Sequence, residues 1–200
     1  MPDFEKTSNP TRDIIPAQIV IGVTGHRKLR NERILAKQVQ KIVIKIKETI
    51  PEVKNIPVEF RILSPLAEGA DRLVARELLK VSGSQLQVVL PLEKDEYLKD
   101  FAHGESREEF NNLLESATSV IQPVSNPKRP EAYMAVGRYI VDHCDVLIAI
   151  WDGNTTNGKG GTADVVDYAR EKKCPIFWIH SNDPKRITYE EGRGFSPNAL

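Results

Sequence analysis

Val146-Leu147-Ile148-Ala149-Ile150-Trp151 is the most apolar run in the chain, and Asp152-Gly153 and the stretch Gly158-Lys159-Gly160-Gly161-Thr162-Ala163-Asp164 follow it. A continuous apolar run of this length is typical of a buried strand, and the glycines predict a loop that leads into a helix. The N–H groups at a helix start favour an anion, and glycine lets the backbone approach it closely. We therefore expect a strand, a loop and a helix around an anionic group, with phosphate as the first candidate.

Apolar runs alternate with helical patterns on both sides of this unit. The runs predict strands over residues 18–24, 58–63, 85–90, 119–124, 145–151 and 174–179. Apolar residues at helical spacing predict helices over residues 31–50, 71–81, 106–116, 131–143 and 162–172. Strands of this kind that alternate with helices indicate a parallel sheet covered on both faces. We therefore expect an α/β fold, Rossmann-like and doubly wound, with a mostly parallel sheet.

The chain divides into three parts by composition. Residues 1–17 are polar and rich in proline, which indicates a flexible leader. Residues 18–180 hold all the predicted strands and helices and are long enough for one domain with its own core. Residues 181–200 contain two prolines and three acidic residues, and we expect them to be an unstructured tail or a linker.

The composition indicates which classes of partner and which cellular compartment to expect. Twenty-eight basic residues balance 28 acidic ones, so the net charge gives no support for a nucleic-acid or membrane partner. We find no signal peptide at the polar N-terminus and no apolar stretch that would span a bilayer. Cys144 and Cys174 are expected to be buried thiols in a reducing compartment, which predicts a cytoplasmic protein. The histidines and cysteines are too scattered for a metal site, and we expect no metal and no cofactor.

Polar and glycine-rich loops follow four of the predicted strands. In open α/β sheets the ligand binds beyond the carboxyl ends of the strands, so these loops predict one crevice. The candidate ligand-binding residues are Gly25, His26, Arg27, Glu68, Gly69, Asp71, Asp152, Gly153, Gly158, Gly160, Gly161 and Thr162.

Two of these candidates directly follow the first strand. The planar fork of Arg27 suits a phosphate or a carboxylate, and the alternative is a surface salt bridge. His26 is either a hydrogen-bonded structural histidine or a catalytic one.

The acidic candidates differ in their expected roles. Asp71 stands at a helix start, which explains it on structural grounds alone, so we prefer Glu68 as the residue that contacts the ligand. Asp164 could cap its helix, contact a ribose or serve as a catalytic carboxylate. Arg72 and Arg76 lie one turn apart, and we expect them on a solvated helix face.

Three segments resemble motifs of the SLOG superfamily, the Rossmann-like group that contains DNA-processing protein A and the LOG (lysine-decarboxylase-like) phosphoribohydrolases. They are Ile21-Gly22-Val23-Thr24-Gly25-His26-Arg27, Ser64-Pro65-Leu66-Ala67-Glu68-Gly69-Ala70-Asp71 and Gly160-Gly161-Thr162. The resemblance implies a nucleotide-like small molecule as the ligand. Related domains often pair, so it also implies a homo-oligomer.

The LOG enzymes cleave the N-glycosidic bond of a nucleoside monophosphate with the motif Pro-Gly-Gly-x-Gly-Thr-x-Glu-Glu. Gly158, Gly161 and Thr162 match this motif, whereas Lys159 stands where a glycine is usual and Asp164-Val165 replaces the two glutamates. The missing second carboxylate favours binding over hydrolysis.

Three functions compete on this reading. The leading one is binding or sensing of a nucleotide or an NAD-derived phosphorylated molecule. The alternative is an enzyme that cleaves or transfers the N-glycosidic bond of a nucleoside monophosphate, with Glu68 or Asp164 as the catalytic carboxylate. The third is a nucleic-acid module, as in the DNA-processing branch, and it would show affinity that falls steeply with salt.

Overall fold

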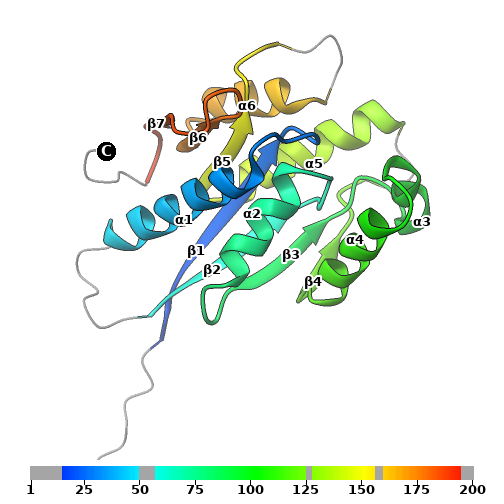
Figure 1. Ribbon diagram of the computed structural model, residues 1–200, viewed down its shortest axis with the longest axis horizontal. Coiled ribbons are helices and arrows are strands. Elements are labelled where there is room, and N and C mark those ends of the chain that lie inside the picture. Colours follow the sequence, from blue (N-terminus) through cyan, green and yellow to red (C-terminus); the bar gives the residue numbers. More distant parts are fainter. Residues whose placement is uncertain (1–14, 50–56, 125–127, 156–159, 195–200) are drawn as a thin grey trace, which may run out of the picture.

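A computed structural model describes residues 15–49, 57–124, 128–155 and 160–194 of the protein (Figure 1). Its strands are β1 (Ala17–Gly25), β2 (Val58–Ser64), β3 (Gln85–Val89), β4 (Ser119–Ile121), β5 (Val146–Trp151), β6 (Ile176–His180) and β7 (Ile187–Glu190). Its helices are α1 (Glu32–Glu48), α2 (Ala70–Leu79), α3 (Lys94–Tyr97), the 3-10 turn η2 (Leu98–Asp100), α4 (Glu105–Glu115), α5 (Arg129–His143) and α6 (Thr162–Glu171).

The strands form one sheet in the order β4-β3-β2-β1-β5-β6-β7. Strands β1 to β6 are parallel to their neighbours, and β7 pairs antiparallel with β6. The chain starts at the centre, moves outward to β4, and returns to the other side of β1 as β5. The expected Rossmann-like, mostly parallel sheet is therefore confirmed, and strand order reverses between β1 and β5, where such folds bind ligands.

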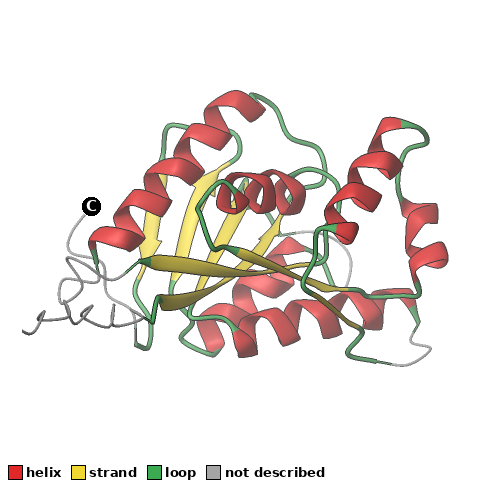
Figure 2. Cartoon of the chain, turned by 90° about the horizontal axis from the view of Figure 1, so that it is seen from below, coloured by secondary structure: helices red, strands yellow, loops and turns green. Residues whose placement is uncertain are grey.

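Helices cover both faces of the sheet (Figure 2). Side chains alternate between the faces along β5, so Ile148 and Ile150 join the core under α1, α2 and α4. Leu147, Ala149 and Trp151 join the second core under α5 and α6. All six residues of β5 are buried, which explains why its sequence reads as an unbroken apolar run.

The C-terminal part differs from the expected tail or linker, because residues 187–190 form β7. The ring of Tyr189 lies 4.9 Å from that of Phe177, centroid to centroid, across the β6–β7 pair. Arg170 of α6 donates from Nη2 and Nε to the two carboxylate oxygens of Glu190, at 2.7 and 2.8 Å. This short strand is held by β6 before it and by Arg170 of α6, and the four residues 187–190 carry no apolar run that would reveal it. The predicted leader lies largely outside the described residues.

The two thiols lie together at the end of the sheet where β5 begins. Cys174 is buried, Cys144 is half-buried, and their Sγ atoms are 3.6 Å apart without a disulfide. The expectation of buried thiols is therefore confirmed in full for Cys174. Among the helices of the described ranges, none combines the length and the apolar character that crossing a membrane requires.

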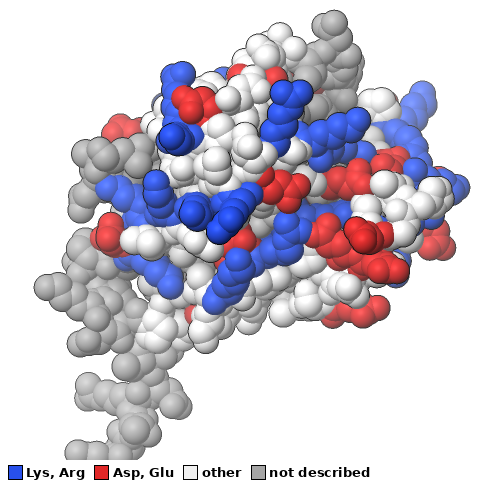
Figure 3. Space-filling view, viewed as in Figure 1, with Lys and Arg blue, Asp and Glu red and all other residues white. Residues whose placement is uncertain are grey.

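Basic side chains form a local cluster on one face although the composition is balanced. Figure 3 shows this cluster over α1, and acidic side chains interspersed with further basic ones towards α4. Arg33, Lys37 and Lys41 follow one another by single helical turns along α1. The zero net charge therefore conceals a local basic surface.

Candidate ligand-binding site

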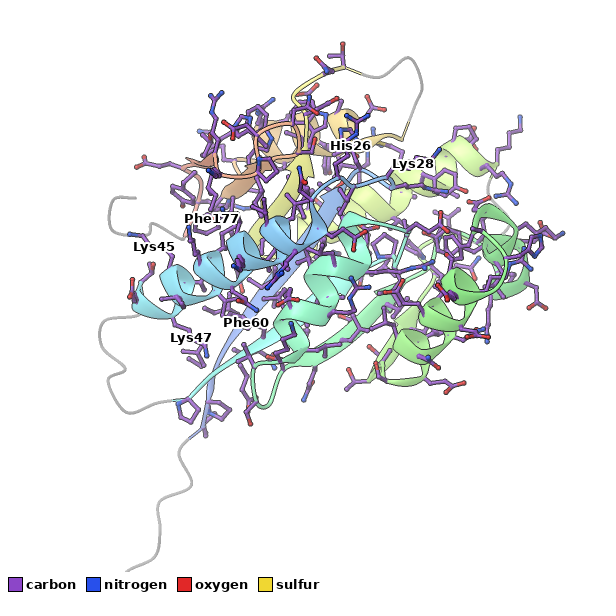
Figure 4. The ribbon with its side chains drawn as sticks, in the orientation of Figure 1. His26, Lys28, Lys45, Lys47, Phe60 and Phe177 are labelled. Carbon is purple, nitrogen blue, oxygen red and sulfur yellow. The ribbon has the colours of Figure 1, made fainter. Side chains whose placement is uncertain are left out.

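A cavity of about 280 Å³ lies at the carboxyl ends of β1, β2 and β3. Its walls are the residues after these strands, one side of α5, Tyr97 of α3 and the start of α6. Figure 4 shows His26 and Lys28 in the loop after β1, at the opposite end of the molecule from Lys45 and Lys47. Of the twelve ligand-binding candidates, seven line this cavity: Gly25, His26, Arg27, Asp71, Gly160, Gly161 and Thr162.

The floor of the cavity depends on two glycines that bring the first two loops together. A Cβ at Gly25 would lie 2.5 Å from Cβ of Ala70 and 2.6 Å from the carbonyl oxygen of Ile150. Gly69 has a φ of +79°, and a Cβ there would lie 2.5 Å from the carbonyl oxygen of His26. That same oxygen accepts a hydrogen bond from the N–H of Ala70 at 3.0 Å. Gly25 and Gly69 therefore act through the close approach of backbone, and Gly69 does not itself line the cavity.

Arg27 presents its guanidinium to the cavity and also to a carboxylate at its edge. Its Nη2 lies 3.6 Å from Oδ2 of Asp100, and its Cζ lies 5.6 Å from the centroid of the Tyr133 ring. Asp100 also accepts hydrogen bonds from Arg129 and from the Tyr133 hydroxyl. The Arg27 side chain is 41% exposed, so an anionic ligand can reach it.

The start of α6 forms the opposite wall. Gly161 is its N-cap and has no side chain to accept a hydrogen bond, so the first-turn N–H groups have no side-chain acceptor among the described residues. Gly160 has a φ of +85° and packs against α5, where a Cβ would lie 2.9 Å from the carbonyl oxygen of Pro130. Thr162 adds a hydroxyl at the first position of the helix. Gly158, the remaining glycine candidate, lies outside the described residues.

Asp164 is engaged in holding this loop. Its Oδ2 accepts a hydrogen bond of 2.6 Å from the N–H of Gly160. The side chain lines a separate surface groove between α5 and α6 rather than the cavity. Of the three roles considered for Asp164, this geometry corresponds to capping.

Asp152 and Gly153 lie beside the cavity. Asp152 accepts hydrogen bonds from the backbone N–H and the side-chain amide of Asn154, at 2.9 and 3.0 Å. The pKa of Asp152 lies below its usual range, first because of the Asn154 backbone hydrogen bond and further because of the Asn154 side chain and His26. The φ of +89° at Gly153 allows the turn that follows β5.

His26 connects the loop after β1 to the loop after β5. Its Nε2 lies 3.2 Å from the backbone nitrogen of Asp152 and 3.1 Å from Oδ1 of the same residue. A neutral ring with its proton on Nδ1 accepts from the N–H, whereas a protonated ring donates to the carboxylate. In both states the ring holds these loops together, which is the geometry expected of a structural histidine.

Glu68 faces away from the cavity. Its Oε1 accepts hydrogen bonds from the N–H of Ala102, at 2.9 Å, and from the hydroxyl of Ser106. Burial raises the pKa of Glu68, but the hydrogen bonds from Ser106 and Ala102 and the charges of Arg72 and Arg27 together outweigh burial, so the pKa lies below its usual range. The carboxylate that we preferred for ligand contact therefore anchors the start of α4.

Asp71, in contrast, is 5% exposed and lines the cavity. Its Oδ2 accepts a hydrogen bond of 3.2 Å from the N–H of Ala67. Its Oδ1 is buried and has no hydrogen-bond partner among the described residues. Burial raises the pKa of Asp71 from 3.8 to about 7, against the lowering effects of the Ala67 hydrogen bond and of two arginines.

The spacing of apolar residues in the sequence already indicates that the Asp71 side chain is buried, which its position at a helix start does not explain. Val74, Ala75 and Leu78 stand three, four and seven residues after Asp71, and all three are buried. Residues at this spacing share one helix face. Asp71 therefore lies on the apolar face of α2, where a carboxyl group is unusual.

The expectation that Arg72 lies on a solvated helix face is wrong, because the residue is only 1% exposed. Its Nε donates to the carbonyl oxygen of Leu66 at 2.9 Å, and its Nη1 donates to that of Ser106 at 2.7 Å. Its guanidinium lies 4.5 Å from the centroid of the Phe101 ring. Arg72 thus fastens the α3–α4 segment to the sheet, whereas Arg76 is 42% exposed.

The fold and this cavity together define an α/β domain of Rossmann-like topology with a polar pocket at its strand ends. Neither the scan against protein-family models nor the search of curated proteins matched the chain. Within the described ranges, no group of three or more His, Cys, Asp and Glu side chains is arranged to hold a metal ion.

Proposed function

We propose that this protein binds a nucleotide or another nucleotide-derived phosphorylated small molecule in the cavity, and that it does so to sense the molecule. One observation carries the proposal: Arg27 and the start of α6 line the same cavity at the carboxyl ends of parallel strands. A guanidinium and a helix N-terminus are complementary to the same chemical group, a phosphate. This is also the ligand class that the resemblance to the SLOG superfamily implies.

The size of the cavity supports a small ligand. Its volume of about 280 Å³ lies just below the range of about 300–1,000 Å³ that is usual for ligand pockets. A sugar phosphate or a mononucleotide suits such a volume better than a dinucleotide.

Arg27 has a competing partner that the ligand would have to replace. Its 3.6 Å contact with Asp100 is longer than a hydrogen bond, and two oxygens of a phosphate can form the bidentate pair that this contact lacks. Asp100 stays compensated by Arg129 when Arg27 turns to the ligand. The exchange therefore leaves no unpaired charge at the edge of the cavity.

The enzymatic alternative, cleavage or transfer of an N-glycosidic bond, has weaker support. The two carboxylates suggested for it are occupied elsewhere, Glu68 by Ala102 and Ser106 and Asp164 by Gly160. Neither lines the cavity. A binding function needs no carboxylate pair and is therefore favoured.

Isothermal titration calorimetry with nucleoside mono-, di- and triphosphates, ADP-ribose and ribose 5-phosphate tests the proposal. We expect Arg27→Gln to weaken binding by about tenfold or more, because hydrogen bonds to charged groups contribute about 1.5–3 kcal/mol. Arg76→Gln is the matched control, since Arg76 is equally exposed but lies outside the cavity.

Binding of none of these compounds by the wild-type protein would overturn the proposal. Equal losses in the two arginine variants would also contradict it. Release of free base from a nucleoside monophosphate would instead support the enzymatic alternative.

A further inference from the structure

Among the described residues that line the cavity, Asp71 has a buried side-chain oxygen without a hydrogen-bond partner. Oδ1 of Asp71 is buried and without a hydrogen bond among the described residues, although its neighbour Oδ2 is satisfied by Ala67. An unsatisfied buried oxygen is costly, and native proteins keep few of them. Because Asp71 lines the cavity, a bound ligand is in a position to supply the missing hydrogen bond.

The two arginines nearest to Asp71 do not supply the missing hydrogen bond to its Oδ1. Arg27 pairs with Asp100, and Arg72 donates to the backbone carbonyls of Leu66 and Ser106. Both arginines act on Asp71 through their charge, but neither forms a hydrogen bond with it. The carboxyl group is therefore held in place by Ala67, and its Oδ1 stays without a partner in the wall of the cavity.

We propose that Asp71 is the specificity-determining residue of the cavity and that its Oδ1 binds a hydroxyl group of the ligand's sugar, which makes the ligand a ribose phosphate or a ribonucleotide. This inference rests on the proposed function, since it assumes that a phosphate occupies the site at Arg27 and α6. Asp71 thus takes the place of Glu68 as the carboxylate that contacts the ligand and of Asp164 as the one considered for the ribose.

A hydroxyl group fits Asp71 better than the other groups of a nucleotide. A phosphate oxygen is negative and would meet a second acidic group in a poorly solvated place. An ammonium group needs a charged carboxylate, which burial disfavours here. A hydroxyl both donates and accepts, so it pairs with Asp71 whether or not the carboxyl group carries a proton.

The arrangement also separates the two ends of the ligand. The cations and amides that suit a phosphate come from Arg27 and from the start of α6, whereas Asp71 comes from the first turn of α2. A ligand that contacts all of them must carry a phosphate and a hydroxyl on one compact frame. Ribose 5-phosphate is the smallest part of a nucleotide that does so.

The test combines two ligands with two proteins. Calorimetry compares ribose 5-phosphate with 2,3-dideoxyribose 5-phosphate, on the wild-type protein and on Asp71→Ala. We expect the wild type to prefer the ribose compound by about tenfold or more, because only that compound supplies a partner to the otherwise unmatched Oδ1. In Asp71→Ala the preference is lost while the affinity for the dideoxy compound is kept.

Two further variants make the result specific. Glu77→Ala is the control, because Glu77 is also a buried carboxyl group of α2 but lies outside the cavity and bonds to Gln40 and Lys80. It should leave the preference unchanged. Asp71→Val fills the position without a polar side-chain atom, so it serves if the alanine variant does not fold, and it too should abolish the preference.

The outcomes separate the two proposals. A wild-type protein that binds both compounds equally, or variants of Asp71 that keep the full preference, would overturn the role of Asp71 and leave phosphate binding intact. A wild-type protein that binds neither compound nor any nucleotide would overturn the proposed function, and this inference with it.

Discussion

Replacing Asp71 with asparagine should change how the stability of the unliganded protein depends on pH. The carboxyl group has a pKa of 3.8 in an ordinary environment and about 7 in the fold, because burial disfavours its charged form. A raised pKa means that the folded state holds the proton more tightly than the unfolded state. The stabilisation from this proton is therefore complete below pH 3.8 and is lost as the pH rises to about 7.

The magnitude follows from the two pKa values. At about 1.4 kcal/mol per pKa unit, the difference between 3.8 and about 7 amounts to about 4 kcal/mol in the free energy of unfolding. Part of this is already lost at pH 5, so about 3 kcal/mol remains to be lost between about pH 5 and about pH 8. Such a loss is a large fraction of the stability of an ordinary domain.

Urea unfolding of the wild type and of Asp71→Asn measures this loss directly. Asparagine has a similar volume, offers an acceptor to Ala67 and does not titrate, so the other titrating groups cancel in the difference. We expect the asparagine variant to gain about 3 kcal/mol relative to the wild type between about pH 5 and about pH 8. A difference that stays constant over this range would refute the claim that Asp71 is buried with a raised pKa.

Two further predictions concern packing and charge at the same site. Gly25→Val should lower the free energy of unfolding by about 1–3 kcal/mol in urea unfolding, because its Cβ would collide with Ala70 and with the backbone of Ile150; a neutral effect would contradict the close packing of the two loops. Asp100→Asn should tighten binding of ribose 5-phosphate by a few-fold in calorimetry, since Arg27 then loses a competing carboxylate; weaker binding would show that Asp100 positions Arg27 rather than competing with the ligand.

The sheet could be predicted from sequence because its signals are local. The apolar run of β5 and the helical spacing of Leu35, Val39, Ile42 and Ile46 in α1 reflect burial directly. The expected position of Gly160 and Gly161 just before α6 is confirmed for a similar reason, since backbone geometry limits which residues can stand there.

The choice between Glu68 and Asp71 could not be made in the same way. Both residues stand near the start of α2, and their directions depend on where α4 packs: Ala102 and Ser106, more than 30 residues away in sequence, take up the Glu68 carboxylate. Arg72 was misplaced for a related reason, because its burial under Phe101 depends on the same distant segment. Tertiary contacts decide the roles of these side chains. The sequence pattern predicts which residues share a helix face, but not which distant residues they contact.

Asp100 gives the cavity a thermodynamic connection to the rest of the molecule. This one carboxylate joins Arg27, after β1, to Arg129, at the start of α5. If a ligand's phosphate and Asp100 compete for Arg27, each weakens the other's hold by the same factor, as reciprocity of coupled equilibria requires. Any contact that draws Asp100 towards α5 would then raise the affinity of the cavity, and occupation of the cavity would strengthen that contact to the same extent.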